Sequence, residues 1–321
     1  MQEPVYNQPP SCEEPLELCV GLAGRYKIEV TKPDGRVEVL ADWFENLITD
    51  QGLNRWGTGD IVKFCSVGTG TNQPTNGDTS LQALLATTAT NSYTTPSVVP
   101  TGGAPYSHLV ARVFSFAQGA VVGNISEVGV GWLAAAGNLF SHARIKDGGG
   151  VDTTITIASI DQLNITYQLK INVPDTDVTG NITISAVSTN TVVRPASITG
   201  AGWTNVIPGN ASPFDNSFNG SSSNGDTACT AYAGPLGAVT GTPSGTAFNA
   251  STGVAGVYGN NNLYNDRTFT LSTAQGNVPG GIGAIYVDAG LGQWQMSFSP
   301  LVAKDNTKTF SFVFRTSWAR T

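Results

Sequence analysis

Two histidines, His108 and His142, are the side chains of this sequence that could act as an acid or a base near neutral pH. A nucleophilic triad needs a histidine held by a carboxylate and a nucleophile on a strained turn, and the sequence has no Gly-x-Ser-x-Gly segment. His108 precedes an alternating segment, and His142 lies between Phe140 and Arg144, so neither has a diagnostic neighbour. We therefore expect ordinary surface or strand histidines and no catalytic residue.

Three aspartates suggest a second kind of chemistry. Hydrolysis of a glycosidic bond uses two carboxyl groups about 5–9.5 Å apart, and the pairs Asp147/Asp152 and Asp152/Asp161 are candidates by proximity alone. Asp147 also precedes three glycines at 148–150, where an aspartate side chain commonly caps a turn. Turn capping is the favoured interpretation, and a polysaccharide depolymerase is the less favoured alternative.

Two glycine clusters have the letters of a phosphate-binding loop. The first, at 68–70, has Gln73 where a third glycine is needed, and the second, at 129–134, is followed at once by Gly137 and Asn138. The first therefore fails the pattern, and the second leaves no room for the helix whose N-terminus would hold a pyrophosphate. We expect both clusters to be bulges or close strand crossings, and we expect no cofactor.

No metal site is predicted either, because the four cysteines are few and scattered: Cys12, Cys19, Cys65 and Cys229. The formal net charge of −7, without any basic run, argues against direct contact with nucleic acid. No stretch of 18 apolar residues occurs, so membrane insertion is not expected. The first residues lack the pattern of a secretory signal, so we expect synthesis in the cytoplasm of a host cell.

The elements that would position these residues are mostly strands. Alternation at 26–30 and 37–39 around a Pro-Asp-Gly turn predicts a hairpin. A short helix capped by Thr49 or Asp50 is predicted to end at Gly57, and a second is predicted over 78–85 with Asp78 as its cap. Further strands are predicted at 61–67, 110–116, 155–157, 165–173, 182–184, 294–298 and 310–318.

Alternation of polar and apolar residues is typical of sheets with one buried face, which antiparallel pairing allows. The fold class is therefore all-β: an antiparallel sandwich, jelly-roll-like, with one or two short helices in the N-terminal third and a loop-rich β insertion. We divide the chain into an extended N-terminal arm (1–20), a β-sandwich body (21–195), an insertion rich in Gly, Ser and Asn (196–285) and C-terminal strands that complete a sheet (286–321).

The insertion keeps many aromatic residues although it has few charges: Trp203, Phe214, Phe218, Tyr232, Phe248, Tyr258 and Tyr264. We expect most of these rings to fill the space between loops, because aromatic side chains are mostly buried. Stacking on the sugar rings of a host-surface glycan is the alternative.

Several phrases, taken in order, resemble structural proteins of tailed-bacteriophage virions. They are RYKIEV at 25–30, ADWFENLI at 41–48, DQGLNR at 50–55, CSVGTG at 65–70, ISEVGVGW at 125–132, NLFSHARI at 138–145 and DQLNITY at 161–167. The resemblance covers about half of the chain and implies a tail, collar or fibre component located in the virion. It brings no catalytic residues with it.

The favoured hypothesis is a non-enzymatic virion subunit that acts by self-association. Only 12% of the residues are charged, about half of the roughly 25% typical of globular proteins, and charge is depleted where subunits pack together. The expected partners are copies of the same chain, in a ring or trimer, and other virion proteins. The arm 1–20 and the apolar strand 307–318, which could complete a neighbour's sheet, are the expected interface. A host-receptor or polysaccharide-binding fibre module is the second hypothesis, and the depolymerase is the third.

Overall fold

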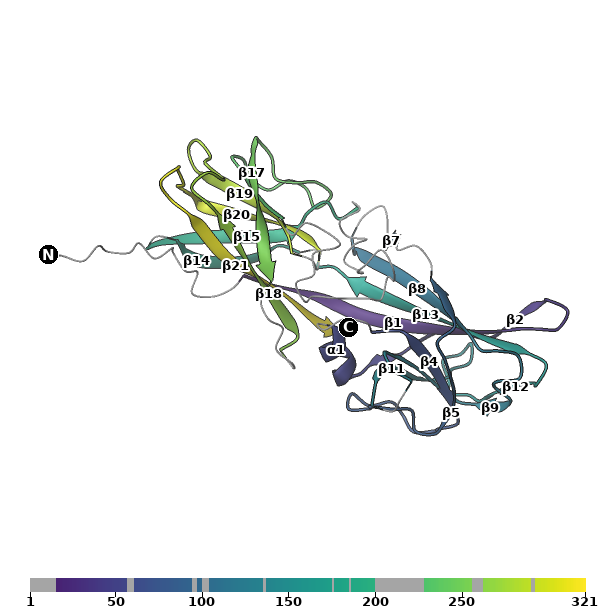
Figure 1. The fold of residues 1–321 in the computed structure, drawn as a ribbon. Helices are drawn as coiled ribbons and strands as arrows, with labels where there is room; N and C mark the ends of the chain where they lie inside the picture. Colours follow the sequence, from purple (N-terminus) through teal and green to yellow (C-terminus); the bar gives the residue numbers. More distant parts are fainter. Residues whose placement is uncertain are drawn as a thin grey trace.

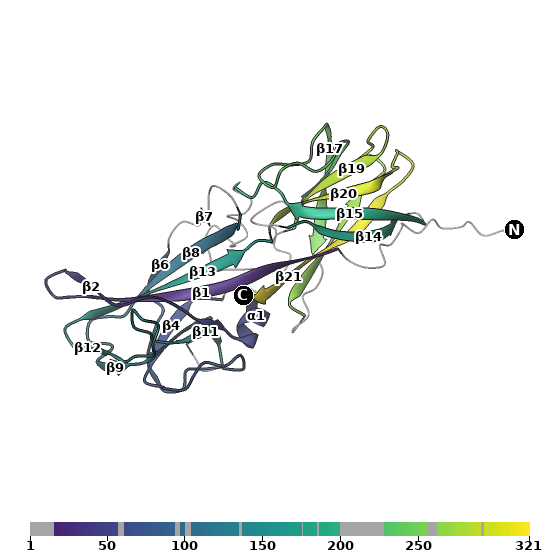
Figure 2. The same ribbon diagram turned by 180° about the vertical axis from the view of Figure 1, so that it is seen from behind.

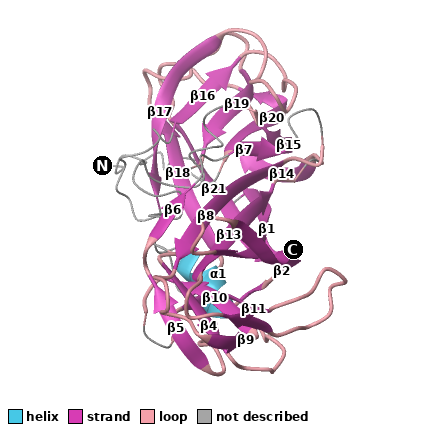
Figure 3. Ribbon diagram, turned by 90° about the vertical axis from the view of Figure 1, so that its right-hand side faces the viewer, coloured by secondary structure: helices cyan, strands magenta, loops and turns pink. Residues whose placement is uncertain are grey.

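The computed structural model describes residues 16–56, 61–93, 97–99, 104–134, 137–174, 176–184, 186–199, 228–255, 262–289 and 292–321. Strands dominate these residues, and almost all of them pair antiparallel (Figure 3). The expected all-β, sandwich-like class is therefore confirmed.

The largest sheet has fourteen strands. Twelve follow one another in the order β14 (Val178–Ile184), β15 (Val187–Pro195), β20 (Gln293–Val302), β19 (Ile282–Asp288), β16 (Ala228–Tyr232), β17 (Ala247–Ala255), β18 (Tyr264–Leu271), β21 (Phe310–Arg320), β1 (Leu16–Thr31), β13 (Gln162–Asn172), β8 (Ser107–Ser115) and β6 (Asn91–Tyr93). Off this path, β2 (Val37–Glu45) pairs with β1, and β7 (Ser97–Val99) pairs with β8.

Two smaller sheets accompany it. The five-stranded sheet has the order β3 (Leu47–Ile48), β11 (Leu139–Arg144), β10 (Glu127–Gly131), β4 (Phe64–Gly68) and β5 (Leu84–Thr88). The two-stranded sheet joins β12 (Ile155–Ile157) to β9 (Gly123–Ile125), and the helix α1 spans Asp50–Trp56.

Strand β1 joins the two ends of the elongated molecule (Figures 1 and 2). Its first half runs parallel to β21, its second half pairs with β2, and β13 lies along its other edge. Its 16 residues extend over roughly 50 Å at about 3.3 Å per residue. We call the described residues 25–174, which include α1 and the five-stranded sheet, the helix region, and the described residues 176–321 the aromatic region.

The core of the helix region lies between the five-stranded sheet and strands β1 and β13. The rings of Tyr26 on β1 and Tyr167 on β13 are tilted by 47° with centroids 4.9 Å apart, and Phe140 on β11 meets Tyr167 edge to face at 6.4 Å. Every second residue of β13 is buried from Leu163 to Ile171, so the predicted alternation is confirmed.

The first predicted helix is present and begins where its cap was expected. Thr49 Oγ1 accepts a hydrogen bond from the backbone N–H of Gly52 at 3.0 Å and donates one to the carbonyl of Leu139 at 2.6 Å. The same hydroxyl therefore caps α1 and fixes the helix to β11.

The second predicted helix, over 78–85, is wrong. Residues 84–88 form β5, and the segment before it is a loop. The backbone N–H groups of Gln82 and Ala83 are bonded to the Glu127 carboxylate, and the Asp78 carboxylate accepts from Thr75 instead of capping a helix that follows it. A distant charged side chain thus overrides the local helical pattern. The strand predicted at 61–67 is present but begins at Phe64.

The aromatic region is packed around rings from its C-terminal strands. Phe312 stacks on Phe269 and on Phe310, with 5.5 Å between ring centroids in each pair, and Phe298 meets Phe310 edge-on at 5.9 Å. Strands from residues 228–288 and the C-terminal strands share this one sheet.

The terminal strand is not the open interface that the sequence suggested. From Phe314 to Ser317 both edges of β21 are occupied within the chain, by β18 on one side and by β1 on the other. The expectation that 307–318 completes a neighbour's sheet is therefore wrong for residues 314–317, and for residues 307–313 it stays a prediction. Of the predicted arm, residues 16–20 belong to β1, and residues 1–15 lie outside the described residues.

Two hydrogen bonds connect β21 to the helix region. Trp318 Nε1 donates to the carbonyl of Leu53 at 2.8 Å, and Arg320 Nε donates to the carbonyl of Ile48 at 2.7 Å. The end of the chain therefore holds α1 against the junction of the two regions.

Candidate functional site

The polar cluster most able to support chemistry lies on the outer face of the five-stranded sheet, the face directed away from Tyr26. In the antiparallel register, Glu127 of β10 is opposite Gly68 of β4 and Arg144 of β11. Gly129 is likewise opposite Ser66 and His142. Because side chains alternate along a strand, these residues share one face.

His142 lies between two carboxylates. Its Nδ1 is 2.7 Å from Asp78 Oδ2, and its Nε2 is 3.0 Å from Glu127 Oε2. The side chain of His142 is buried, and that of Glu127 is almost fully so. His142 is a strand histidine, as expected, but the fold gives it two carboxylate partners that its sequence neighbours did not reveal.

The Glu127 carboxylate holds the loop that crosses this face. Its Oε1 accepts from the N–H groups of Gly70 at 2.9 Å and Ala83 at 2.8 Å, and its Oε2 accepts from the N–H of Gln82 at 3.0 Å. A Cβ added at Gly68 or at Gly70 would collide with this carboxylate. The prediction of a close crossing at the first glycine cluster is therefore confirmed.

Arg144 adds a second attachment to the same loop. Its Nη1 donates to the carbonyl of Gly70 at 2.7 Å, and Ser126 Oγ donates to that carbonyl at 2.7 Å. Asp152 lies 3.9 Å from Arg144 Nε and also accepts from Gln73 of the loop. The loop of residues 69–83 is thus bonded to the sheet at both of its ends.

The contacts set the charges of the cluster. Burial lowers the pKa of His142, but the hydrogen bonds and charges of Glu127 and Asp78 outweigh burial, so this pKa is raised above its ordinary value of 6.5. Burial acts to raise the pKa of Glu127, yet the His142 bond and the three backbone N–H groups lower it to about 2. The pKa of Asp78 is also lowered, because its bonds to Thr75 and His142 outweigh burial. These shifts favour a protonated imidazole between two carboxylates.

This arrangement suits anchoring rather than proton transfer. A general base needs a nitrogen lone pair directed at a substrate, and here both ring nitrogens are directed at carboxylates. A charged hydrogen-bonded network in a buried place stabilises one position of the segments that it joins. We therefore interpret the cluster as the anchor of the loop 69–83.

Sequence reasoning missed Glu127 and assigned Asp78 to a helix cap, not to His142. Glu127 did leave a signal, since it is the one charge in a strand that continues as Val-Gly-Val-Gly, and glycines on one face of a strand indicate that another segment lies close to it. His142 is 15 positions from Glu127 and 64 positions from Asp78, so no local spacing could have identified the cluster.

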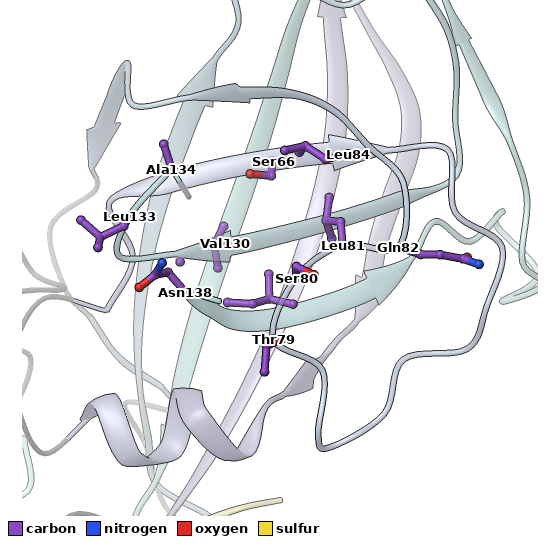
Figure 4. Close-up of a pocket in the computed structure, with 12 residues that line it drawn as sticks. Ser66, Thr79, Ser80, Leu81, Gln82, Leu84, Val130, Leu133, Ala134 and Asn138 are labelled. Atoms are coloured by element: carbon purple, nitrogen blue, oxygen red, sulfur yellow. The ribbon is translucent and has the colours of Figure 1, made fainter. Parts of the chain in front are cut away.

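A pocket of about 210 Å³ adjoins the cluster on the same face (Figure 4). Leu133 and Ala134 lie at one end of it and Gln82 at the other, with Ser80 and Leu81 of the loop between them. All twelve residues that line it are uncharged: Ser66, Thr79, Ser80, Leu81, Gln82, Leu84, Val130, Gly131, Leu133, Ala134, Asn138 and Leu139.

Glycines shape the floor of this pocket. A Cβ on Gly131 would collide with the carbonyl oxygen of Asn138, and one on Gly129 would lie 2.6 Å from Leu139 Cδ1 and 3.0 Å from Leu81 Cδ2. The register of β10 and β11 also shifts between Val130 and Gly131. The second glycine cluster is therefore a bulge with a close strand crossing, as predicted.

The remaining sequence candidates lie in other surroundings. His108 is fully buried, so the expectation of an ordinary surface or strand histidine holds only for its place in β8, and burial lowers its pKa to about 4. Asp147 Oδ1 accepts from the N–H groups of Gly149 and Val151 at 2.9 Å each, so the predicted turn capping is confirmed. Asp161 is buried and lies 2.9 Å from Lys32 Nζ.

The described aromatic residues of the insertion are engaged within the chain. Phe248 packs against the core, and the guanidinium of Arg315 lies 3.6 Å above the ring of Tyr264. Tyr232 is half-buried on β16. The other four predicted rings lie outside the described residues: Trp203, Phe214, Phe218 and Tyr258.

Over the part of the chain that the structure describes, no group of three His, Cys, Asp or Glu side chains is arranged to hold a metal ion. The helix of these residues is too short and too polar to cross a membrane. Comparison of the chain with protein-family models, with curated proteins and with solved structures found no match.

Proposed function

We propose that this chain is a non-enzymatic structural subunit of a tailed-phage virion, which acts by binding copies of itself and other virion proteins. The phrases at 25–70 and 125–167 that resemble such proteins support the proposal. The low content of charged residues supports it as well, because subunit interfaces are depleted of charge.

One structural observation carries the proposal furthest: apolar side chains are exposed on open sheet edges. Among the described residues, six of the twelve exposed large apolar side chains lie on the edge strands β2, β5 and β14: Val37, Val39, Trp43, Leu84, Leu85 and Val178. An edge strand offers unpaired backbone groups to another strand, and apolar side chains beside it add hydrophobic stabilisation.

The anchoring cluster is consistent with this role. The arrangement of His142 and its carboxylates fixes a surface loop instead of presenting a reactive group. A subunit that works by packing needs surfaces that keep one shape in each copy, and bonds from the sheet to the loop 69–83 provide this.

The proposal is tested by sedimentation velocity of the purified chain over a hundredfold range of concentration, followed by electron microscopy of the largest species. We expect discrete oligomers whose proportion rises with concentration. A monomer at every concentration, together with failure of the tagged chain to enter particles when it is supplied during phage assembly, would contradict the proposal.

A further inference from the structure

The three apolar edges differ in how open they are to another strand. Strand β2 has Glu38, Asp42 and Glu45, and its pairing with β1 has two register irregularities. Charges and bulges of this kind protect an edge from pairing with other chains. On β14, Val178 is the one exposed large apolar residue.

Strand β5 has no charged residue to protect its free side, although its pairing with β4 has one register irregularity, between Val67 and Gly68. Its sequence, Leu-Leu-Ala-Thr-Thr, contains no charge and no proline, and within the described residues it pairs with β4 alone. Leu84 is 55% exposed and Leu85 is 44% exposed. Of the three edge strands, β5 is therefore the one that exposes two leucines, and no charged residue lies on the same strand.

The uncharged pocket lies directly beside this edge, and Leu84 belongs to both. Two of the four exposed leucines among the described residues line the pocket, Leu84 and Leu133, and a third, Leu85, follows Leu84 on β5. Its volume of about 210 Å³ is below the roughly 300–1,000 Å³ typical of small-molecule sites. A single inserted side chain fits these dimensions.

We propose that strand β5 and the adjoining pocket form a two-fold interface with a second copy of this chain. The inference rests on the proposed function and names one contact through which the subunits associate. A two-fold interface uses the same patch on both partners, so the patch must contain both a projection and a recess. Here the leucines are the projection and the pocket is the recess.

Charge selects β5 over β2 for this self-pairing. In an antiparallel pair centred on Ala86, Leu85 faces Thr87 of the other copy and Leu84 faces Thr88, so no like charges meet. A two-fold pair of β2 strands would instead bring Glu38, Asp42 and Glu45 of both copies together. A sugar is a poorer occupant of the pocket, because its rim is aliphatic and no aromatic ring lines it.

The first test replaces the projecting side chains. Leu84→Lys/Leu85→Lys places charges on both sides of the two-fold axis, and we expect the dissociation constant measured by sedimentation equilibrium to rise by about a hundredfold or more. The matched control is Val37→Lys/Val39→Lys on β2, which makes the same change at two exposed apolar positions and should alter the constant by less than about threefold. Circular dichroism and thermal unfolding confirm that both variants fold.

The second test locates the axis. Residues directly opposite each other in an antiparallel pair have Cα atoms about 4.5–5.5 Å apart, within the range of a disulfide. Ala86→Cys, in a chain whose Cys12 and Cys19 are changed to serine, should therefore form a disulfide-linked dimer on mild oxidation. Thr71→Cys, on the exposed part of the loop, is the control and should not.

The outcomes separate the two proposals. If the wild-type chain associates but the lysine variant associates equally well and Ala86→Cys does not link, the β5 interface is wrong and the proposed function stands on other contacts. If the wild-type chain remains a monomer in the same runs, both are contradicted.

Discussion

The helix region and the aromatic region stabilise similar antiparallel strands in different ways. Of the described residues, six of the seven buried acidic, basic or histidine side chains lie in the helix region: His108, Arg112, Glu127, His142, Arg144 and Asp161. The seventh, Lys304, lies in the aromatic region, whose interior is filled by phenylalanine and tryptophan rings.

The difference follows from what each region has to cover. The outer face of the five-stranded sheet has glycines at 68, 129 and 131, so side chains alone cannot cover it and a loop must lie against it. A loop brings unpaired backbone N–H groups, which need buried acceptors such as Glu127. Apolar packing depends little on pH, whereas a charged network depends on it, and this contrast can be tested by mutation.

The largest effect is expected in the aromatic region. Phe312→Ala removes a ring that stacks on both Phe269 and Phe310, and we expect the free energy of unfolding to fall by about 3–5 kcal/mol. Urea denaturation at pH 6 and at pH 8 should give the same loss, because the contact is apolar. The exposed Val187→Ala is the control, within about 0.5 kcal/mol of the wild type. A loss below about 1 kcal/mol for Phe312→Ala would show that the rings are not the core.

A smaller loss is expected from Glu127→Gln. The amide keeps the size of the side chain but directs an NH₂ group at N–H donors or at His142, so the free energy of unfolding should fall by about 2–3 kcal/mol. Hydrogen exchange should become faster for the amides of Gly70, Gln82 and Ala83. Glu38→Gln, on a half-exposed side chain, is the matched control and should change neither quantity. Unchanged exchange in the loop would refute its anchoring by Glu127.

Gly131→Ala tests the close crossing under the pocket. The added Cβ collides with the carbonyl of Asn138, and overpacking of this kind costs about 1–3 kcal/mol. Gly77→Ala places a methyl group where nothing lies within 4 Å and should be neutral in the same thermal-unfolding assay. Equal stability of the two variants would argue against the crossing.

The smallest effect is a pH dependence that the charged network of the helix region should cause. Because the folded pKa of His142 is raised, its stabilisation is fully present below pH 6.5 and is lost as the pH rises through the folded pKa. Glu127 has a folded pKa of about 2. It therefore stabilises the folded state fully above pH 4.5, and this stabilisation is lost as the pH falls toward 2. His108 has the opposite effect on stability. Because its folded pKa is lowered to about 4, it reduces the free energy of unfolding as the pH falls from 6.5 to about 4, and it changes nothing above that range.

Above pH 7 the His142 contribution can therefore be measured without interference from His108. We expect the free energy of unfolding of the wild type to decline between pH 7 and 8.5, and His142→Asn to flatten that decline. His108→Asn is the control and should leave the slope unchanged. If the free energy of unfolding declines equally with pH in the wild type and in His142→Asn, the raised pKa of His142 is contradicted.

The strands were largely predictable because burial on one face leaves alternation in the sequence, as in β13. The cap at Thr49 was predictable for a similar reason, since a cap is local. The helix proposed over 78–85 failed because Glu127, more than forty positions away, takes the N–H groups that a helix would use.

The candidate site was the least predictable part. Asp78, Glu127 and His142 come from three segments, and nothing in their spacing indicates that they meet. The free edge at β5 was equally hidden, because whether a strand is central or at an edge depends on the pairing of the whole sheet. The terminal strand shows the converse: its apolar sequence suggested an open edge, and the fold places it between two partners.

The claim that this chain works by associating with itself is tested most directly by hydrogen–deuterium exchange at two protein concentrations, one far below and one far above the range in which oligomers form. We predict that exchange slows at the higher concentration in peptides that contain Leu84–Thr88, while peptides from β2 exchange at the same rate. Exchange that is independent of concentration in every peptide would contradict the account.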